Sequence, residues 1–325
     1  MKTASLLERS EARSDSATIP AQRLRLTMAA VRVAFTWFGV QKSLTREQKA
    51  QAAETFDAEG QFLSATKKLI DTTHPAFRAV TSVRGQIEAF WKSQSLPFPE
   101  PGIRLIKQTD VESFARQIDD YRDKLDDAVA ELDHHFDELK RSACDRLGRL
   151  FNGADYPDPL HGLFHVTYDF PSIEPPDYLV ALSPQLYDQE RERVAARFEE
   201  AVRLAEEAFL SEFGRLVAHL SERLTGDAQD GAPKVFRDSA VGNLVSFFDR
   251  FKQLNVRSNA QLDAIVAEAQ RIVRNVGPQD LRDNTALRQR VAEDLLRVQT
   301  GLDDLLIDRP RRRILRGGDP QREAS

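Results

Sequence analysis

Two stretches of about forty residues each carry a helical pattern, and this feature constrains the fold more than any other. Residues 109–152 contain no proline, and their first glycine is Gly148. Residues 183–226 are equally regular and follow a proline-rich connector. A helix of forty residues extends roughly 60 Å, which is well beyond an ordinary globular helix. The sequence therefore predicts an elongated, largely helical architecture.

The first long stretch has the pattern of a helix that packs along a narrow seam. Thr109 and Glu112 have the spacing of a capping box, in which each side chain satisfies a free backbone donor. The apolar residues recur in alternating steps of three and four, as in a coiled coil. They are Val111, Phe114, Ile118, Tyr121, Leu125, Ala128, Leu132, Phe136, Leu139, Ala143, Leu147 and Leu150. We predict one uninterrupted helix over residues 109–152.

The second long stretch has clear signals at both ends. Ser183 is placed as the N-cap, Pro184 takes the first helical position, and Gly226 suits a C-cap. The steps of its apolar stripe follow an eleven-residue repeat, which favours a straight path over a tight supercoil. The stripe is Val194, Phe198, Val202, Ala205, Phe209, Phe213, Leu216, Leu220 and Leu224. Because the two seams match only in part, we expect an antiparallel helical hairpin rather than a long regular coiled coil.

Three short segments between the helices have the period of β-strands. Residues 31–37 and 164–170 alternate apolar with other side chains, and residues 103–107 are a further strand candidate. A lone strand leaves an unpaired edge, so we expect the three to form a small sheet at one end of the hairpin. The predicted fold class is mainly α with a small β element, a long antiparallel helical hairpin and a C-terminal helical region.

The remaining segments complete a four-part domain scheme. Residues 1–20 are polar and predict a disordered arm, residues 21–226 form the hairpin domain with its sheet, and residues 234–308 form the C-terminal helical region. Residues 309–325 predict a basic disordered tail. The shorter helices are expected from a Thr45–Gln48 cap to about Ala58, at 61–71, at 75–92, around 236–251 and from a Ser258–Gln261 cap to Ile272. A final helix is expected after Gly277-Pro278, and it carries Leu287 to Leu305.

The composition is that of a soluble protein with a charged helical surface. The formal net charge is −5, which argues against nucleic acid as a partner of the whole surface. Cys144 is the single cysteine, so no intramolecular disulfide is expected and a reducing cytoplasm is favoured. We expect no signal peptide, and the longest apolar-leaning stretch, residues 28–40, is too short to span a membrane.

Two histidine-bearing segments are candidate metal sites. Glu131, His134, His135 and Glu138 lie within two turns, and Glu131-x-x-His134 has the spacing used in di-iron carboxylate bundles. Such bundles need a second pair of this kind, which the chain does not offer, so a solvated charged face is the other interpretation. His161 and His165 are four residues apart in a Pro/Gly-rich stretch, without the glutamate of a metalloprotease motif.

One basic cluster gives candidate phosphate contacts: Arg309, Arg311, Arg312, Arg313 and Arg316. It has no interleaved aromatic residues that would stack on bases. The alternative is a solubilising tail. No Gly-rich phosphate loop, nucleophile elbow or paired-cysteine motif accompanies it, so no catalytic residue, cofactor or metal ligand is assigned.

Three segments carry a resemblance to a known group of proteins. The segments are Thr36-Trp-Phe-Gly39, Leu96-Pro-Phe-Pro-Glu-Pro-Gly102 and Asp280-Leu-Arg-Asp-Asn284. At these positions the chain resembles a family of uncharacterised helical proteins of bacteria and phages, a domain of unknown function. The resemblance implies the cargo of a mobile element, with MoxR- or CobS-like AAA ATPases as a partner class.

The sequence leads to three hypotheses about function. The first is a cytoplasmic, non-enzymatic scaffold or adaptor of a mobile element or phage, which binds a protein partner, such as an AAA ATPase system, or itself through its long helices. The second is a nucleic-acid accessory protein that uses the arginine cluster. The third is a metal-dependent enzyme at Glu131, His134 and His135. The first hypothesis argues against nucleic acid and against a membrane as the partner.

Overall fold

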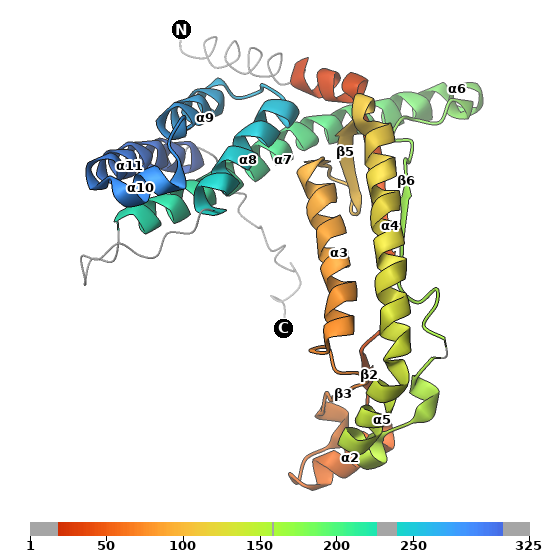
Figure 1. Ribbon diagram of the computed structural model, residues 1–325. Helices are drawn as coiled ribbons and strands as arrows, with labels where there is room; N and C mark the ends of the chain where they lie inside the picture. The colour runs from red at the N-terminus through yellow and green to blue at the C-terminus, as the bar shows by residue number, and fades with distance from the viewer. Residues whose placement is uncertain (1–18, 158, 226–238, 308–325) are drawn as a thin grey trace, which may run out of the picture. The chain divides into compact units, whose positions relative to one another are not determined.

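The structure is a computed structural model that describes residues 19–157, 159–225 and 239–307 (Figure 1). It is 69% helical with a small antiparallel sheet, as the sequence predicts. The chain divides into an N-terminal unit, Ala21–Ala201, and a C-terminal unit that begins at Val202 and includes Pro20. This division falls inside one long helix rather than at the predicted boundary after residue 226, which lies outside the described residues.

The N-terminal unit contains most of the short elements. Residues 19–27 are helical and run directly into the first strand. The helices are α2 (Arg46–Glu54), α3 (Pro75–Ser93), α4 (Val111–His134), α5 (Phe136–Leu147), α6 (Tyr178–Leu182) and the first part of α7 (Pro184–Thr225). The strands are β1 (Met28–Thr36), β2 (Gln41–Ser43), β3 (Thr66–Lys68), β4 (Leu96–Pro97), β5 (Ile103–Lys107) and β6 (His165–Asp169). Short 3-10 turns occupy Gly60–Phe62, Gln108–Asp110, Gly148–Leu150 and Gly153–Asp155.

Four of the strands form one antiparallel sheet in the order β4-β5-β1-β6. The sheet confirms the three strands that the sequence predicts and adds the two-residue strand β4. In the central strand β1, Arg32 lies opposite Ile103 on one side and Asp169 on the other. Val31 and Val33 are buried whereas Arg32 is exposed, because successive side chains of a strand point to opposite faces.

The antiparallel hairpin of the N-terminal unit pairs α4 with α3. The rings of Phe90 and Phe114 stack at 5.3 Å where α3 ends and α4 begins. At the other end, the rings of His74 and His135 lie 5.1 Å apart. The predicted pairing of the two long helices is therefore wrong. An apolar stripe shows that a helix face is buried, but it does not show what covers that face.

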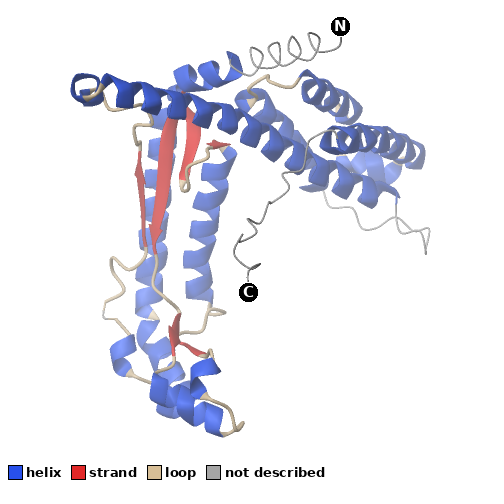
Figure 2. Ribbon diagram, turned by 180° about the vertical axis from the view of Figure 1, so that it is seen from behind, coloured by secondary structure: helices blue, strands red, loops and turns tan. Residues whose placement is uncertain are grey.

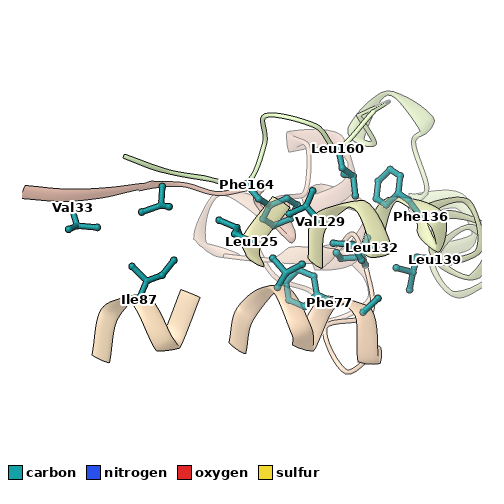
Figure 3. Close-up of a cluster of buried hydrophobic side chains, with 14 of the residues drawn as sticks. Val33, Phe77, Ile87, Leu125, Val129, Leu132, Phe136, Leu139, Leu160 and Phe164 are labelled. Carbon is teal, nitrogen blue, oxygen red and sulfur yellow. The ribbon is translucent and has the colours of Figure 1, made fainter. Parts of the chain in front are cut away.

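The hairpin and the sheet enclose one hydrophobic core (Figure 3). Side chains of α3, α4, α5, β1 and β6 meet in it, together with the segment that precedes β6. Among them are Phe77, Ile87, Leu125, Leu132, Phe136, Leu160 and Phe164. Burial of these side chains holds α3 and α4 against one face of the sheet, since each large apolar side chain contributes about 1.5–3 kcal/mol when it leaves water.

The predicted single helix over residues 109–152 is two helices. Its capping box does not form, because Gln108–Asp110 is a 3-10 turn and the Thr109 hydroxyl donates to the Asp110 carboxylate at 2.9 Å. The chain tightens at His135, whose N–H donates to the Leu132 carbonyl oxygen at 3.1 Å. At the far end, Gly148 adopts a φ of 50° and ends α5.

The predicted helix over residues 61–71 is also wrong. Its place is taken by a 3-10 turn and by β3, which pairs with β2 in a separate two-stranded sheet. Gly60 packs so closely on α2 that an added Cβ atom would lie 3.0 Å from the Ala50 Cα. The capping box of α2 is confirmed, with Thr45 and Gln48 bonding each other's backbone N–H.

The C-terminal unit contains the rest of α7 together with α8 (Ser239–Leu254), α9 (Ala260–Val273), α10 (Pro278–Asp283) and α11 (Thr285–Ile307). The predicted final helix, which carries Leu287 to Leu305, is confirmed as α11, and the Asn284 side chain before it accepts from the Leu287 N–H at 2.9 Å. The cap of α9 is Asn259 rather than Ser258. Five phenylalanine side chains join α7 to α8: Phe209, Phe213, Phe247, Phe248 and Phe251.

Candidate functional site

The sequence-predicted site residues lie only in part within the described residues. Arg309, Arg311, Arg312, Arg313 and Arg316 lie outside the described residues. His161 lies in the loop before β6, and His165 is the first residue of that strand. The phosphate contacts of the arginine cluster therefore stay a prediction.

The histidine-bearing turn between α4 and α5 forms a network of exposed contacts. The Nε2 atom of His135 lies 3.2 Å from Glu131 Oε1, and its Nδ1 atom lies 3.7 Å from Glu138 Oε2. His134 is exposed at the end of α4. In the described part of the chain, no group of three or more His, Cys, Asp or Glu side chains is arranged to hold a metal ion. The contacts that are present are polar contacts on a helix surface, which contribute little to stability.

A buried ionic cluster, which we call the Lys–Asp–Lys cluster, joins the β2–β3 sheet to the loop after α5. The Asp155 carboxylate lies 2.5 Å from Lys42 Nζ and 2.6 Å from Lys67 Nζ. The Lys67 ammonium also donates to the Leu150 carbonyl oxygen at 2.6 Å. The hydrogen bond from Lys42 and the charge of Lys67 hold the pKa of Asp155 below its ordinary value. Because both ammonium groups contact the same carboxylate, this cluster fastens the β2–β3 sheet to the loop after α5.

A hydrogen bond from a tyrosine hydroxyl joins the loop after α5 to the residue that follows β3. The Tyr156 hydroxyl donates to the Leu69 carbonyl oxygen at 2.8 Å, and burial raises the pKa of this hydroxyl. The Tyr156 ring stacks on Phe151 at 5.1 Å. Sequence reasoning missed the whole arrangement, because its members are distant in the chain and no periodic pattern joins them.

An exposed apolar surface lies where α6 gives way to α7. Tyr178, Val180 and Leu182 in α6 are 64%, 51% and 75% exposed, and Leu186 in the first turn of α7 is 52% exposed. The Ser183 hydroxyl between the helices accepts from the Leu186 N–H at 3.5 Å, consistent with the predicted N-cap. We call Tyr178, Val180, Leu182 and Leu186 the α6–α7 surface. Single exposed apolar residues are ordinary, and these four are candidate partner contacts because they lie within nine residues of one another.

Charged side chains lie close in the chain to the residues of the α6–α7 surface. Arg25 pairs with Glu174 through two hydrogen bonds, one of them from Nε to Oε1 at 2.7 Å, and this pairing raises the pKa of the guanidinium. Asp177 and Asp188 are exposed on either side of the apolar residues, and Leu26 is exposed beside Arg25 in the chain. An apolar centre with a charged border is typical of a protein–protein interface.

Comparisons with known proteins do not identify a function for this surface. No family model, no curated protein and no solved structure matches the chain. In the described residues, no helix is both long and apolar enough to cross a membrane. Function is therefore argued from the geometry of the surfaces themselves.

Proposed function

We propose that this chain is a non-enzymatic adaptor that docks a partner protein on the α6–α7 surface. The observation that carries the proposal is the group of four exposed apolar side chains within nine residues. Burying one such side chain at an interface contributes about 1.5–3 kcal/mol, so a partner that covers three or four of them gains a sizeable binding energy. Their close spacing supports an anchor cluster of the kind that dominates protein interfaces.

The finer parts of this function rest on the sequence. The origin in a mobile element or phage, the AAA ATPase as partner and the cytoplasmic location come from the resemblance and from the lone cysteine. Cys144 is the single cysteine of the chain, which favours a reducing compartment. The nucleic-acid alternative depends on the arginine cluster at residues 309–316. Deleting residues 309–325 should leave the binding of the protein partner unchanged, and a loss of that binding would favour the alternative.

The adaptor proposal is tested by making the surface polar. The double variant Leu182→Ser/Leu186→Ser should lose the partner that cross-links to the wild-type chain in the cells that produce it. Both side chains are exposed, so the variant should fold normally, with a stability change within about 0.5 kcal/mol. The matched control is Leu296→Ser, because Leu296 is also about half exposed and is the one exposed large apolar residue among the described side chains of α11. If the double variant retains the same cross-linked partners as the control, the α6–α7 surface is not the docking site.

A further inference from the structure

The four-stranded sheet has one edge that is blocked and one that is open. At the blocked edge, β4 has only two residues, and one of them, Pro97, has no N–H to donate. At the other edge, β6 has five residues and contains no proline. In both views of the molecule β6 lies on the outer side of its unit (Figures 1 and 2). Long open edges are usually blunted or covered, because they recruit other strands.

The outer side of β6 has backbone N–H and C=O groups that do not pair within the sheet. Its inner side pairs with β1, from Arg32 opposite Asp169 to Thr36 opposite His165. Every second residue of an edge strand turns its N–H and C=O outward, so β6 offers two or three residues for further pairing. Thr167 and Asp169 are also exposed to solvent. Among the described residues, no backbone hydrogen bond outside the ladder is made by residues 165–169.

A row of aspartates on α4 borders this open edge. Asp119 accepts a hydrogen bond from the Tyr168 hydroxyl at 3.2 Å, and Asp133 accepts from the Leu160 N–H, just before β6, at 3.1 Å. Asp126 lies midway between them, seven residues from each, so all three lie on the same side of the helix. Arg122 is the basic neighbour, paired with Asp119 at 3.0 Å. We call Asp119, Asp126 and Asp133 the acidic row.

We propose that β6 is a docking edge for an extended basic segment of a partner protein, which adds to the sheet as a fifth strand. Alternate side chains of a strand are about 7 Å apart on one face. Asp119 and Asp126 are separated by about 10 Å along the helix axis. A segment with Lys or Arg at alternate positions would therefore place positive charges along the acidic row while its backbone pairs with β6.

The charge of the edge argues against a second copy as the occupant. Pairing β6 with its own counterpart would bring two acidic rows to the same interface, where like charges repel. The inference goes beyond the proposed adaptor function, because it uses a different surface and a different kind of contact. The α6–α7 surface offers apolar side chains, whereas the β6 edge offers backbone groups and negative charge.

The experiment measures binding of synthetic twelve-residue peptides to the full chain by fluorescence anisotropy. The probe alternates Lys with Thr, and its counterpart alternates Glu with Thr. We expect the Lys peptide to bind and the Glu peptide not to bind. We also expect N-methylation of alternate amides along one edge of the Lys peptide to abolish binding, because those amides can no longer donate to β6. Methylation along the other edge should leave binding intact.

Two matched variants test the role of the acidic row. Asp119→Asn/Asp126→Asn should weaken the Lys peptide about tenfold, since each exposed ion pair contributes roughly threefold. The amide that replaces Asp119 can still accept from Tyr168. Asp120→Asn/Asp127→Asn removes the same charge at the same spacing, but on a side of α4 rotated by about 100°. It should change binding less than twofold.

Several results would overturn the inference. If both aspartate variants weaken binding of the Lys peptide equally, binding depends only on the net charge of the protein. If N-methylation along each of the two edges of the peptide leaves its affinity unchanged in both cases, strand addition is excluded. Failure of the Lys peptide to bind would also overturn it. Rapid disulfide-linked dimers of Thr167→Cys in a Cys144→Ser background would show that a second copy occupies the edge. Leu182→Ser/Leu186→Ser should leave peptide binding unchanged, which separates this test from that of the adaptor surface.

Discussion

Replacing Asp155 by asparagine tests whether the Lys–Asp–Lys cluster holds the N-terminal unit together. The carboxylate is 3% exposed and pairs with Lys67, whose side chain is 5% exposed. The variant leaves the Lys67 ammonium buried without a counter-charge, with the Leu150 carbonyl oxygen and the new amide oxygen as neutral acceptors. Breaking a buried ion pair by removing one partner costs about 3–5 kcal/mol. Because the Leu150 bond survives, we expect the lower end, about 3 kcal/mol.

The assay can follow this unit alone. The chain has two tryptophans, Trp37 and Trp91, and both lie in the N-terminal unit. Tryptophan fluorescence during urea titration therefore reports the unfolding of that unit. The control Lys42→Gln should cost less than about 1 kcal/mol, because the Lys42 side chain is 56% exposed. If Asp155→Asn costs no more than this control, the reasoning from burial is refuted.

Two further measurements separate charge from packing. The double variant Asp155→Leu/Lys67→Met should recover most of the loss, since an apolar pair of similar size can replace a buried ion pair. The pKa of Asp155 is lowered in the folded state. Its contribution to stability is then present above the unfolded-state pKa, near 4, and is lost as the pH falls through the folded-state pKa. The stability difference between wild type and Asp155→Asn should narrow below about pH 4, whereas a difference that stays constant with pH would contradict the pairing.

Three other expected outcomes follow from single residues. Phe247→Ala removes the centre of the α7–α8 phenylalanine cluster and should cost about 3–5 kcal/mol in a far-UV circular dichroism melt while the tryptophan transition stays in place. Asp71 should titrate by NMR with a pKa of about 2, because the Thr73 hydroxyl and N–H donate to its carboxylate, and Thr73→Val should raise that pKa. Gly148→Ala should destabilise the N-terminal unit by about 1–3 kcal/mol, because a φ of 50° with this backbone geometry strains a residue that has a Cβ atom.

The sequence predicted the elements that repeat a pattern over many residues. The stripe of α7 and its proline start gave a helix that the structure confirms as Pro184–Thr225. The alternation around Val31 and Val33 gave β1, and residues 103–107 form β5 as expected. Burial of Phe136 and Phe209 is also confirmed. Each of these signals is local, and each depends only on which face of an element must leave water.

The sequence did not predict the features that depend on contacts between distant segments. The stripe of α4 is covered by α3 and the sheet, although nothing in its periodicity distinguishes these partners from α7. The pairing of Lys67 with Asp155 spans two segments that were expected to be a helix and a loop. The sequence did not predict β4, because a strand of two residues that includes Pro97 has no alternating pattern. The α6–α7 surface was likewise missed, since exposure is known only once the core is placed.

The stripe of α7 itself argues that the α6–α7 surface serves something other than folding. From Val194 onward the large apolar residues of this helix are buried or half-buried, beginning with Val194 and Phe198. Before Val194, no residue of α7 is buried, and yet Leu186 is apolar and Leu182 precedes it by four residues. A helix of this length is stabilised by its packed part, so a polar residue at position 186 would serve the fold equally well. Exposed leucines there add only a tendency to associate, which is the property that a docking surface requires.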